Sequence, residues 1–292
     1  EILIGLVGSE MCIRDRIHTK YGEDWFIHFQ DKGPYGRVCH LQPVDWSSGW
    51  PVMGNAGEPY WKFRKPKSDS KTIVNPVETD EFDSSKLGMQ WQWQNDYKES
   101  YGQATSMGFF RLFTYALPEL GDVSNLWYVP NMLLQKTPAD EFTATTKLSF
   151  CSRNSDQYVG LVCMSAEYSS VGLQRTEDGY ELQIRHNPNA MRTHLTDEVL
   201  TVDTLKPTQK GTPRKGRPAE MHIKDVYLRM SIKDSKVNYA YSIDGKKWKK
   251  AGGEYAMGKG RWIGSKIGFF AVDPNKTGRK GFIDIDWFRI SR

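Results

Sequence analysis

Beyond residue 80, apolar and polar residues alternate one by one through most of the chain. The pattern is clearest at residues 142–150, which read FTATTKLSF, and it recurs at residues 226–232 and 237–243. A period of two places apolar side chains on one face of a β-strand and polar ones on the other. Because a single sheet of this kind leaves its apolar face uncovered, two antiparallel sheets stacked face to face are expected. The sequence therefore predicts an all-β sandwich over residues 80–292, without a long amphipathic helix.

Two shorter features refine this prediction. Met89, Trp91 and Trp93 alternate with glutamines, which predicts a half-buried strand whose tryptophans lie in the core rather than on a sugar-binding surface. An Asp-Gly pair at residues 244–245 ends one alternating run before Trp248 and predicts a tight turn there.

Charge and composition narrow the class of protein. Lys and Arg number 40 and Asp and Glu number 35, so the net charge is only +5, which argues against a nucleic-acid partner. A basic loop contains Lys210, Arg214, Lys215 and Arg217 without interleaved aromatic residues, as is typical of a solvated loop. Aromatic residues make up 13% of the chain, as in many β proteins and sugar-binding proteins. The sequence predicts neither a nucleic-acid partner nor a membrane partner.

The cysteines show no local metal-binding or disulfide pattern. There are four of them, Cys12, Cys39, Cys151 and Cys163, with no CxxC pair and no partnering histidine cluster. Zinc sites and disulfide frameworks usually show such spacing. The sequence therefore indicates neither, and it leaves the redox compartment open.

The first 16 residues differ in character from the rest. They read EILIGLVGSEMCIRDR, a short apolar run that lacks the basic start and the cleavage site of a signal peptide. Because SEMCIRDR resembles a translated library adapter, we expect residues 1–16 to be a non-native start. An ordinary strand over residues 2–7 is the alternative.

A hairpin and a linker precede the predicted sandwich. Residues 25–29 and 37–42 predict the two strands of the hairpin, around a Gly/Pro turn. Residues 55–79 are rich in Gly, Pro, Ser and Lys without periodicity, which is the composition of a linker. A lone hairpin buries too little surface to form a stable domain by itself.

The hairpin carries the most specific motif of the chain. Residues 25–43 read WFIHFQDKGPYGRVCHLQP and are followed by Trp46 and by GWPV at residues 49–52. This stretch resembles glycoside hydrolase family 43, of the β-xylosidase and α-L-arabinofuranosidase type, and the resemblance extends over residues 20–292. It implies a five-bladed β-propeller followed by a concanavalin A-like sandwich of the jelly-roll kind. Residues 17–54 would then be a remnant of the last blade, with the upstream blades of the same parent chain as partners.

The resemblance also implies a reaction. Family members of this type are exo-acting, inverting enzymes, so the parent protein is expected to release xylose or arabinose from plant polysaccharide or from xylo- or arabino-oligosaccharides. Inverting hydrolysis needs an acid and a base carboxyl group about 6.5 to 9.5 Å apart. Family members carry these groups on earlier blades, which this sequence does not contain. Asp24, Asp31 and Asp45 are more simply turn or strand-end residues. We therefore assign no catalytic residue and expect this chain alone to be inactive.

Two residues match positions that contact the sugar in family members. Arg37, in the YGR motif, matches a guanidinium offered to sugar hydroxyls, and its planar fork suits two adjacent oxygens. Trp262, in RWIGSKIG, matches an aromatic ring that the sandwich pushes into the propeller's pocket, where it would cover the C–H face of one terminal sugar. The alternatives are a surface arginine and an ordinary sheet tryptophan.

Calcium is the metal that the resemblance suggests, and no cofactor is expected for the chemistry itself. His28 resembles a histidine that ligates a hydrated Ca²⁺ below the sugar site in some family members, with an ordinary structural histidine as the alternative. Glu81 and Asp286, together with Asp83 and Asp284, are candidates for a structural Ca²⁺ site, with solvated edge charges as the alternative.

A function from another class stays open, namely a non-catalytic carbohydrate-binding sandwich whose rings hold a glycan without cleaving it. The hairpin motif favours the enzyme, since a free binding module has no use for the last blade of a propeller. Xylose and arabinose specificity are not separated, because the pocket walls that choose between them lie upstream. Localisation is not fixed either, with a secreted or periplasmic place favoured over a cytoplasmic one.

Overall fold

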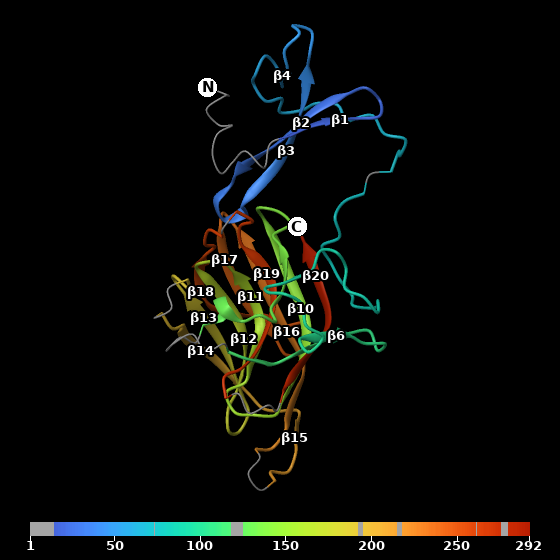
Figure 1. Cartoon of the computed structure of the whole chain (residues 1–292). Coiled ribbons are helices and arrows are strands. Elements are labelled where there is room, and N and C mark those ends of the chain that lie inside the picture. The colour runs from blue at the N-terminus through green and yellow to red at the C-terminus, as the bar shows by residue number, and fades with distance from the viewer. Residues whose placement is uncertain are drawn as a thin grey trace. The chain divides into compact units, whose positions relative to one another are not determined.

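The computed structural model describes residues 15–72, 74–117, 125–191, 195–214, 218–260, 262–275 and 280–292. The chain divides into two compact units, Glu1–Asn75 and Pro76–Arg292, and both are built from strands (Figure 1). The linker predicted over residues 55–79 spans this division. The described residues contain two short 3-10 turns, Gly33–Tyr35 and Leu126–Tyr128, and no α-helix. Nothing in this described part is a helix with the length and apolar character that crossing a membrane requires.

The first unit is an antiparallel sheet that contains the predicted hairpin. Its described strands are β1 (Asp15–His18), β2 (Asp24–Asp31), β3 (Arg37–Asp45) and β4 (Val52–Met53), in the order β1-β2-β3-β4. The hairpin is confirmed, because β2 pairs with β3 from Trp25↔Pro43 to Asp31↔Arg37. Gly33 and Gly36 in the connecting turn have φ angles of 62° and 75°, a left-handed conformation that favours glycine.

This sheet buries little apolar surface. Trp25 is the only buried apolar side chain among its described residues, and its indole Nε1 donates to Glu23 Oε2 at 3.3 Å. Asp15 and Arg16, which belong to the stretch expected to be non-native, pair with β2. The rest of that stretch, with the alternative strand over residues 2–7, lies outside the described residues.

The second unit confirms the predicted sandwich of two antiparallel sheets. The described strands of the first sheet are β6 (Gly102–Ala104), β7 (Phe110–Phe113), β10 (Phe142–Ser152), β15 (Gln209–Lys210), β16 (Met221–Lys233), β17 (Lys236–Ser242), β18 (Lys249–Ala256) and β20 (Phe282–Ser291). Those of the second sheet are β5 (Gln92–Trp93), β8 (Tyr115–Ala116), β9 (Leu133–Lys136), β11 (Tyr158–Met164), β12 (Tyr168–Arg175), β13 (Tyr180–Asn187), β14 (Glu198–Leu205) and β19 (Lys266–Asp273).

The strand order shows how distant segments meet. The first sheet runs β18-β17-β16-β10-β20-β7-β6, with β15 also paired to β16. The second runs β14-β13-β12-β11-β19-β9-β5, and β8 adds a short parallel pairing to β19. In the first sheet, β10 therefore lies between β16 and β20, the last strand of the chain.

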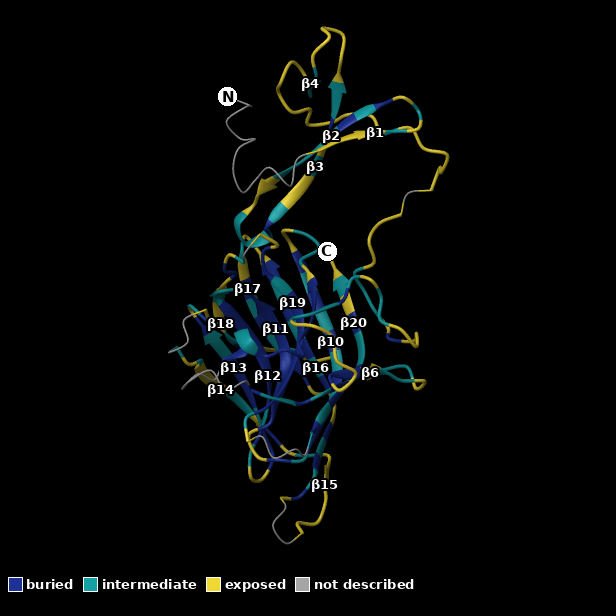
Figure 2. Ribbon diagram, in the orientation of Figure 1, coloured by how far each residue is buried: buried dark blue, intermediate teal, exposed yellow. Residues whose placement is uncertain are grey.

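The apolar side chains of the predicted alternation fill the core between the two sheets. In β10, every second residue from Phe142 to Phe150 is buried and the residues between them are partly exposed. Figure 2 shows the strands of the sandwich largely in the dark blue of buried residues. Phe269 of β19 meets Phe288 of β20 edge to face across the core, with 5.6 Å between the ring centroids. Each fully buried side chain of this size contributes about 1.5 to 3 kcal/mol.

One predicted strand is mostly wrong. The alternation at residues 89–94 predicts a half-buried strand, but β5 covers only two of these residues and Met89 is fully exposed. Gln90 Nε2 and Trp91 Nε1 both donate to Asp80 Oδ2, at 3.1 and 2.7 Å. These side-chain hydrogen bonds hold the segment in a turn, while Trp91 is buried in the core as predicted.

Candidate functional site

Arg37 lies at the start of β3, directly after the glycine turn of the hairpin. It pairs with Asp31 of β2, and its guanidinium carbon lies 4.4 Å from the centroid of the Phe29 ring. A cation against a ring face is held by the quadrupole of the ring. The half-buried Arg37 is thus presented on the face of the hairpin that carries Phe29.

His28 projects from the other face of the same hairpin, because successive residues of a strand point to opposite sides. Its ring stacks on those of Phe26 and His40, with a centroid distance of 5.4 Å in each case. The resemblance implies that His28 and Arg37 serve one sugar site, but this sheet does not place them on one face. Calcium prefers several oxygen ligands, and His28 belongs to no group of three metal-ligating side chains among the described residues. Calcium ligation by His28 stays a prediction.

Trp262 lies in the loop between β18 and β19, so the alternative of an ordinary sheet residue is wrong. Trp262 is 68% exposed and has a φ of 51°, a left-handed conformation that is rare for a bulky residue. The base of the loop is fixed, because the buried Ser265 donates from Oγ to the carbonyl oxygen of Gly258 at 2.7 Å. The neighbouring Ile263 is also exposed. The loop therefore presents an indole from an anchored base.

Glu81 and Asp286, the candidates for structural calcium, each contact a cation. Arg289 donates from Nε and Nη2 to the two carboxylate oxygens of Glu81, at 2.7 Å each, and this hydrogen bonding lowers the pKa of Glu81. Lys147 Nζ lies 3.0 Å from Asp286 Oδ2. Within the described part of the chain, neither carboxylate belongs to a group of three metal-ligating side chains. The calcium site that joins them stays a prediction.

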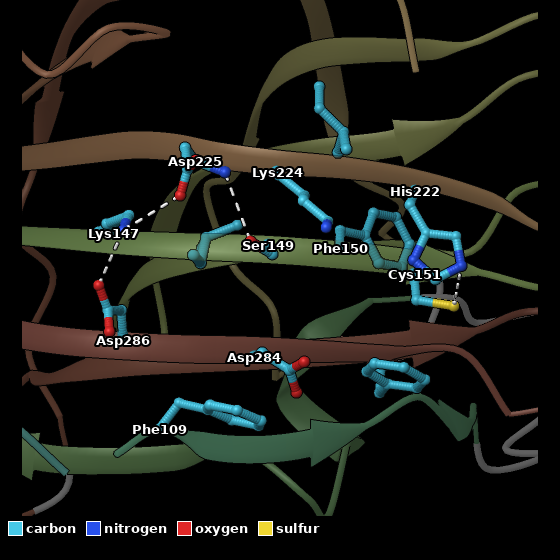
Figure 3. Close-up of a pocket in the computed structure, with 13 residues that line it drawn as sticks. Phe109, Lys147, Ser149, Phe150, Cys151, His222, Lys224, Asp225, Asp284 and Asp286 are labelled. Carbon is cyan, nitrogen blue, oxygen red and sulfur yellow. Dashed lines mark hydrogen bonds and ion pairs between the residues drawn. The ribbon is translucent and has the colours of Figure 1, made fainter. Parts of the chain in front are cut away.

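A pocket of about 220 Å³ lies on the outer face of the first sheet, over β10, β16 and β20, and Phe109, directly before β7, also lines it (Figure 3). Two β-bulges shape it. Lys224 and Asp225 of β16 together face the single residue Ser149 of β10, and Asp286 is an extra residue in β20. Lys147 Nζ reaches both bulges, at 3.0 Å from Asp286 and 3.1 Å from Asp225. Hydrogen bonds to Asp286 and Asp225 raise the pKa of Lys147.

Three side chains with metal-ligating atoms meet at one end of this pocket. Cys151 of β10 lies directly opposite His222 of β16, and its Sγ is 3.4 Å from His222 Nε2 (Figure 3). Glu220 Oε1 lies 2.9 Å from the same nitrogen. Burial raises the pKa of the Cys151 thiol to about 12. The interpretation that no histidine partners the cysteines is therefore wrong for Cys151, since sheet pairing supplies a partner that sequence spacing does not show.

The arrangement of the two sheets defines the class of protein. Two antiparallel sheets packed face to face around an alternating core form a concanavalin A-like β-sandwich. The chain belongs to the family described as the beta-xylosidase C-terminal concanavalin A-like domain, whose model matches residues 79–291. For the sandwich, the resemblance to glycoside hydrolase family 43 is thereby confirmed.

Two of the relatives bear the name of a beta-xylosidase. A beta-xylosidase of Formosa agariphila is 27% identical over 292 residues, covering 90% of this chain and 45% of the relative. A protein of Xylanibacter ruminicola, provisionally named a beta-xylosidase, is 30% identical over 254 residues, covering 85% and 42%. The chain thus spans less than half the length of these two relatives.

A solved structure agrees in fold. The crystal structure of the GH43 BlXynB protein from Bacillus licheniformis superimposes with a TM-score of 0.74, covering 95% of this chain and 52% of that one. The sequence identity is 24%, so this likeness supports the fold alone.

Proposed function

We propose that this chain forms the C-terminal part of an exo-acting, inverting glycoside hydrolase that releases xylose or arabinose from plant polysaccharide or oligosaccharide. Membership of the family supports a hydrolase, and the names of the two relatives favour xylose. The catalytic carboxylates belong, in this proposal, to upstream propeller blades that the sequence does not include. A secreted or periplasmic location would fit a polysaccharide substrate.

The conformation of Trp262 is the observation in the structure that best supports this proposal. The indole of Trp262 is exposed, and the base of its loop is held by a hydrogen bond. Its backbone has a left-handed conformation, and backbone strain of this kind clusters at ligand-binding positions. The ring face would cover the C–H surface of a terminal sugar and narrow the pocket, which favours release of single units. Arg37 would donate from its fork to two sugar hydroxyls.

The test measures kcat/KM of the longer protein that contains this chain and the upstream blades, on an aryl β-xyloside and an aryl α-L-arabinofuranoside. Trp262→Ala should lower kcat/KM by about tenfold or more, since it removes a contact made in the transition state. Tyr97→Ala is the control, because Tyr97 is another exposed aromatic residue of the sandwich, and it should leave kcat/KM unchanged.

The possible outcomes separate the parts of the proposal. Equal kcat/KM for the two variants would contradict the role of Trp262 and leave the hydrolase assignment standing. Retention on insoluble xylan without turnover of either substrate would favour the carbohydrate-binding sandwich instead.

A further inference from the structure

We propose that Cys151, Glu220 and His222 bind a divalent transition-metal ion, for which zinc is the best match. This site differs from the calcium sites that the resemblance suggests, both in its residues and in its ligand types. It lies on the outer face of the first sheet, at one end of the pocket between the two bulges.

Two neighbouring strands hold Cys151 and His222 in place before any metal binds, and Glu220 directly precedes the second strand. Cys151 and His222 are direct partners in the pairing of β10 with β16, and Glu220 precedes His222 by two positions. Residues two apart in an extended chain point to the same side. The sheet therefore sets the spacing of Sγ, Nε2 and Oε1, which all lie within 4.8 Å of one another.

The distances are close to those of a tetrahedral zinc site. Bonds of about 2.3 Å to sulfur and about 2.0 Å to nitrogen and oxygen, at tetrahedral angles, separate S from N by about 3.5 Å and N from O by about 3.3 Å. The corresponding separations are 3.4 Å between Cys151 Sγ and His222 Nε2 and 2.9 Å between His222 Nε2 and Glu220 Oε1. Small side-chain rotations would bring the three atoms around one ion.

The metal-free arrangement leaves one nitrogen with two competing partners. His222 Nε2 has either one proton or one lone pair in the ring plane, and both Cys151 Sγ and Glu220 Oε1 approach it. A metal ion on that lone pair would satisfy all three atoms at once. The donor set of thiolate, imidazole and carboxylate suits zinc, whereas calcium and magnesium prefer oxygen alone.

The surroundings orient the carboxylate and leave room for a fourth ligand. Arg153 Nε donates to Glu220 Oε2 at 2.8 Å, so Oε1 stays directed at His222. Partners of this kind orient the ligands in many metal sites. The pocket beside Cys151 and His222 gives the fourth position access to water or a small anion. Metal binding would displace the thiol proton of Cys151, and affinity would therefore rise with pH.

The test uses the whole chain without an affinity tag, kept reduced, with Zn²⁺ followed by calorimetry and Co²⁺ by absorbance. One metal ion per chain is expected, and Co²⁺ should produce a thiolate-to-cobalt charge-transfer band in the near ultraviolet. Cys151→Ser should abolish this band. Removing a residue that only orients a metal ligand lowers metal affinity about 10- to 100-fold. Replacing a ligand itself, as in Glu220→Gln and His222→Gln, should therefore weaken Zn²⁺ binding by about 100-fold or more.

Controls exclude the thiols of Cys12 and Cys39 and loss of the fold. The double variant Cys12→Ser/Cys39→Ser should bind Zn²⁺ and Co²⁺ as the wild type does. Zn²⁺ should raise the Tm of the wild type and of this double variant, and not that of the three ligand variants. Absence of Zn²⁺ binding by the wild type, or a charge-transfer band that survives in Cys151→Ser, would overturn the proposal. Should Cys151→Ser or His222→Gln lose its circular dichroism, Glu220→Gln decides the test, because the Glu220 side chain is partly exposed.

Discussion

Cys151 and His222 lie directly opposite each other on β10 and β16, with Sγ 3.4 Å from Nε2, although 71 positions separate them in the sequence. Glu220 reaches the same nitrogen from two positions earlier in the chain. Strand pairing brings Cys151 to this pair. The sequence shows no metal motif for Cys151, because its distance to His222 is set across a sheet and not along the chain.

We expect the isolated chain to show no turnover of aryl β-xylosides or α-L-arabinofuranosides. Hydrolysis with inversion needs an acid and a base carboxyl group, which the proposal assigns to upstream residues. The measurement is an assay of the purified chain against a buffer blank. Turnover that disappears when an acidic residue within 17–292 is replaced would contradict this expectation.

Limited proteolysis should cut the first unit long before the second. Among the described residues of Glu1–Asn75, only Trp25 is a buried apolar side chain, whereas the sandwich contains a continuous apolar core. Segments with few buried contacts open at low free-energy cost. Mass spectrometry of early tryptic products should find the sandwich intact. Equal protection of both units would show that the first sheet is more stable than its burial suggests.

Replacing Trp91 with alanine should destabilise the sandwich by about 3 to 5 kcal/mol, the usual cost of removing a buried tryptophan. The Trp91 ring lies 5.3 Å from that of Phe288 and 5.9 Å from that of Phe269, and its Nε1 donates to Asp80. Urea unfolding followed by circular dichroism measures the change. Met89→Ala is the matched control, because Met89 lies two positions away and is fully exposed. Similar losses in the two variants would contradict the burial of Trp91.

The ionised carboxylate of Asp197 should lower the free energy of unfolding at neutral pH. Its Oδ1 accepts hydrogen bonds from Tyr168 and, at 3.0 Å, from Asn187, while the buried Oδ2 has no partner within the described residues. Burial raises the pKa of Asp197. A carboxyl group whose pKa is raised on folding stabilises the fold fully below its unfolded pKa of about 3.9, and this contribution is lost as the pH rises through the folded pKa. Asp197→Asn should thus be at least as stable as the wild type at pH 7.

Asp203 is the control, because its effect on stability should depend on pH with the opposite sign to that of Asp197. Tyr241 donates a hydrogen bond to its carboxylate, which lowers the pKa of Asp203. A lowered pKa stabilises the fold above the unfolded pKa, and the contribution disappears as the pH falls through the folded pKa. Asp203→Asn should therefore lose stability at pH 7 and approach the wild type in acid. Urea unfolding of both variants between pH 3 and pH 8 decides the matter, and a pH dependence of the same sign in both would contradict the argument.

Local pattern predicted the strands because the period of two is a local property. The residues from Phe142 to Phe150 alternate in the sequence, and the same residues alternate between core and surface in β10. The pattern failed at Met89, where hydrogen bonds from Gln90 and Trp91 to Asp80 fix a turn. Such contacts depend on a residue about ten positions away, which periodicity does not detect.

The candidate sites were less predictable for the same reason. Arg37 and Trp262 were found through motifs of a known family, and the structure adds the conformation in which each is presented. The pocket around Lys147 could not be anticipated, since bulges appear only when the register of two strands is known. The Cys151 cluster depends on that register as well.

The bulge at Lys224 and Asp225 has an evolutionary consequence. Ile223 and Val226 both face the core, with two outward residues between them where regular alternation would allow one. Deleting one codon there would restore a regular ladder between β16 and β10, keep every core side chain of β16 facing inward, and remove one of the two bulges that shape the hollow beside Lys147. Descendants of one ancestral gene can thus gain or lose this surface feature by an in-frame change of a single codon, without selection having to rebuild the interior.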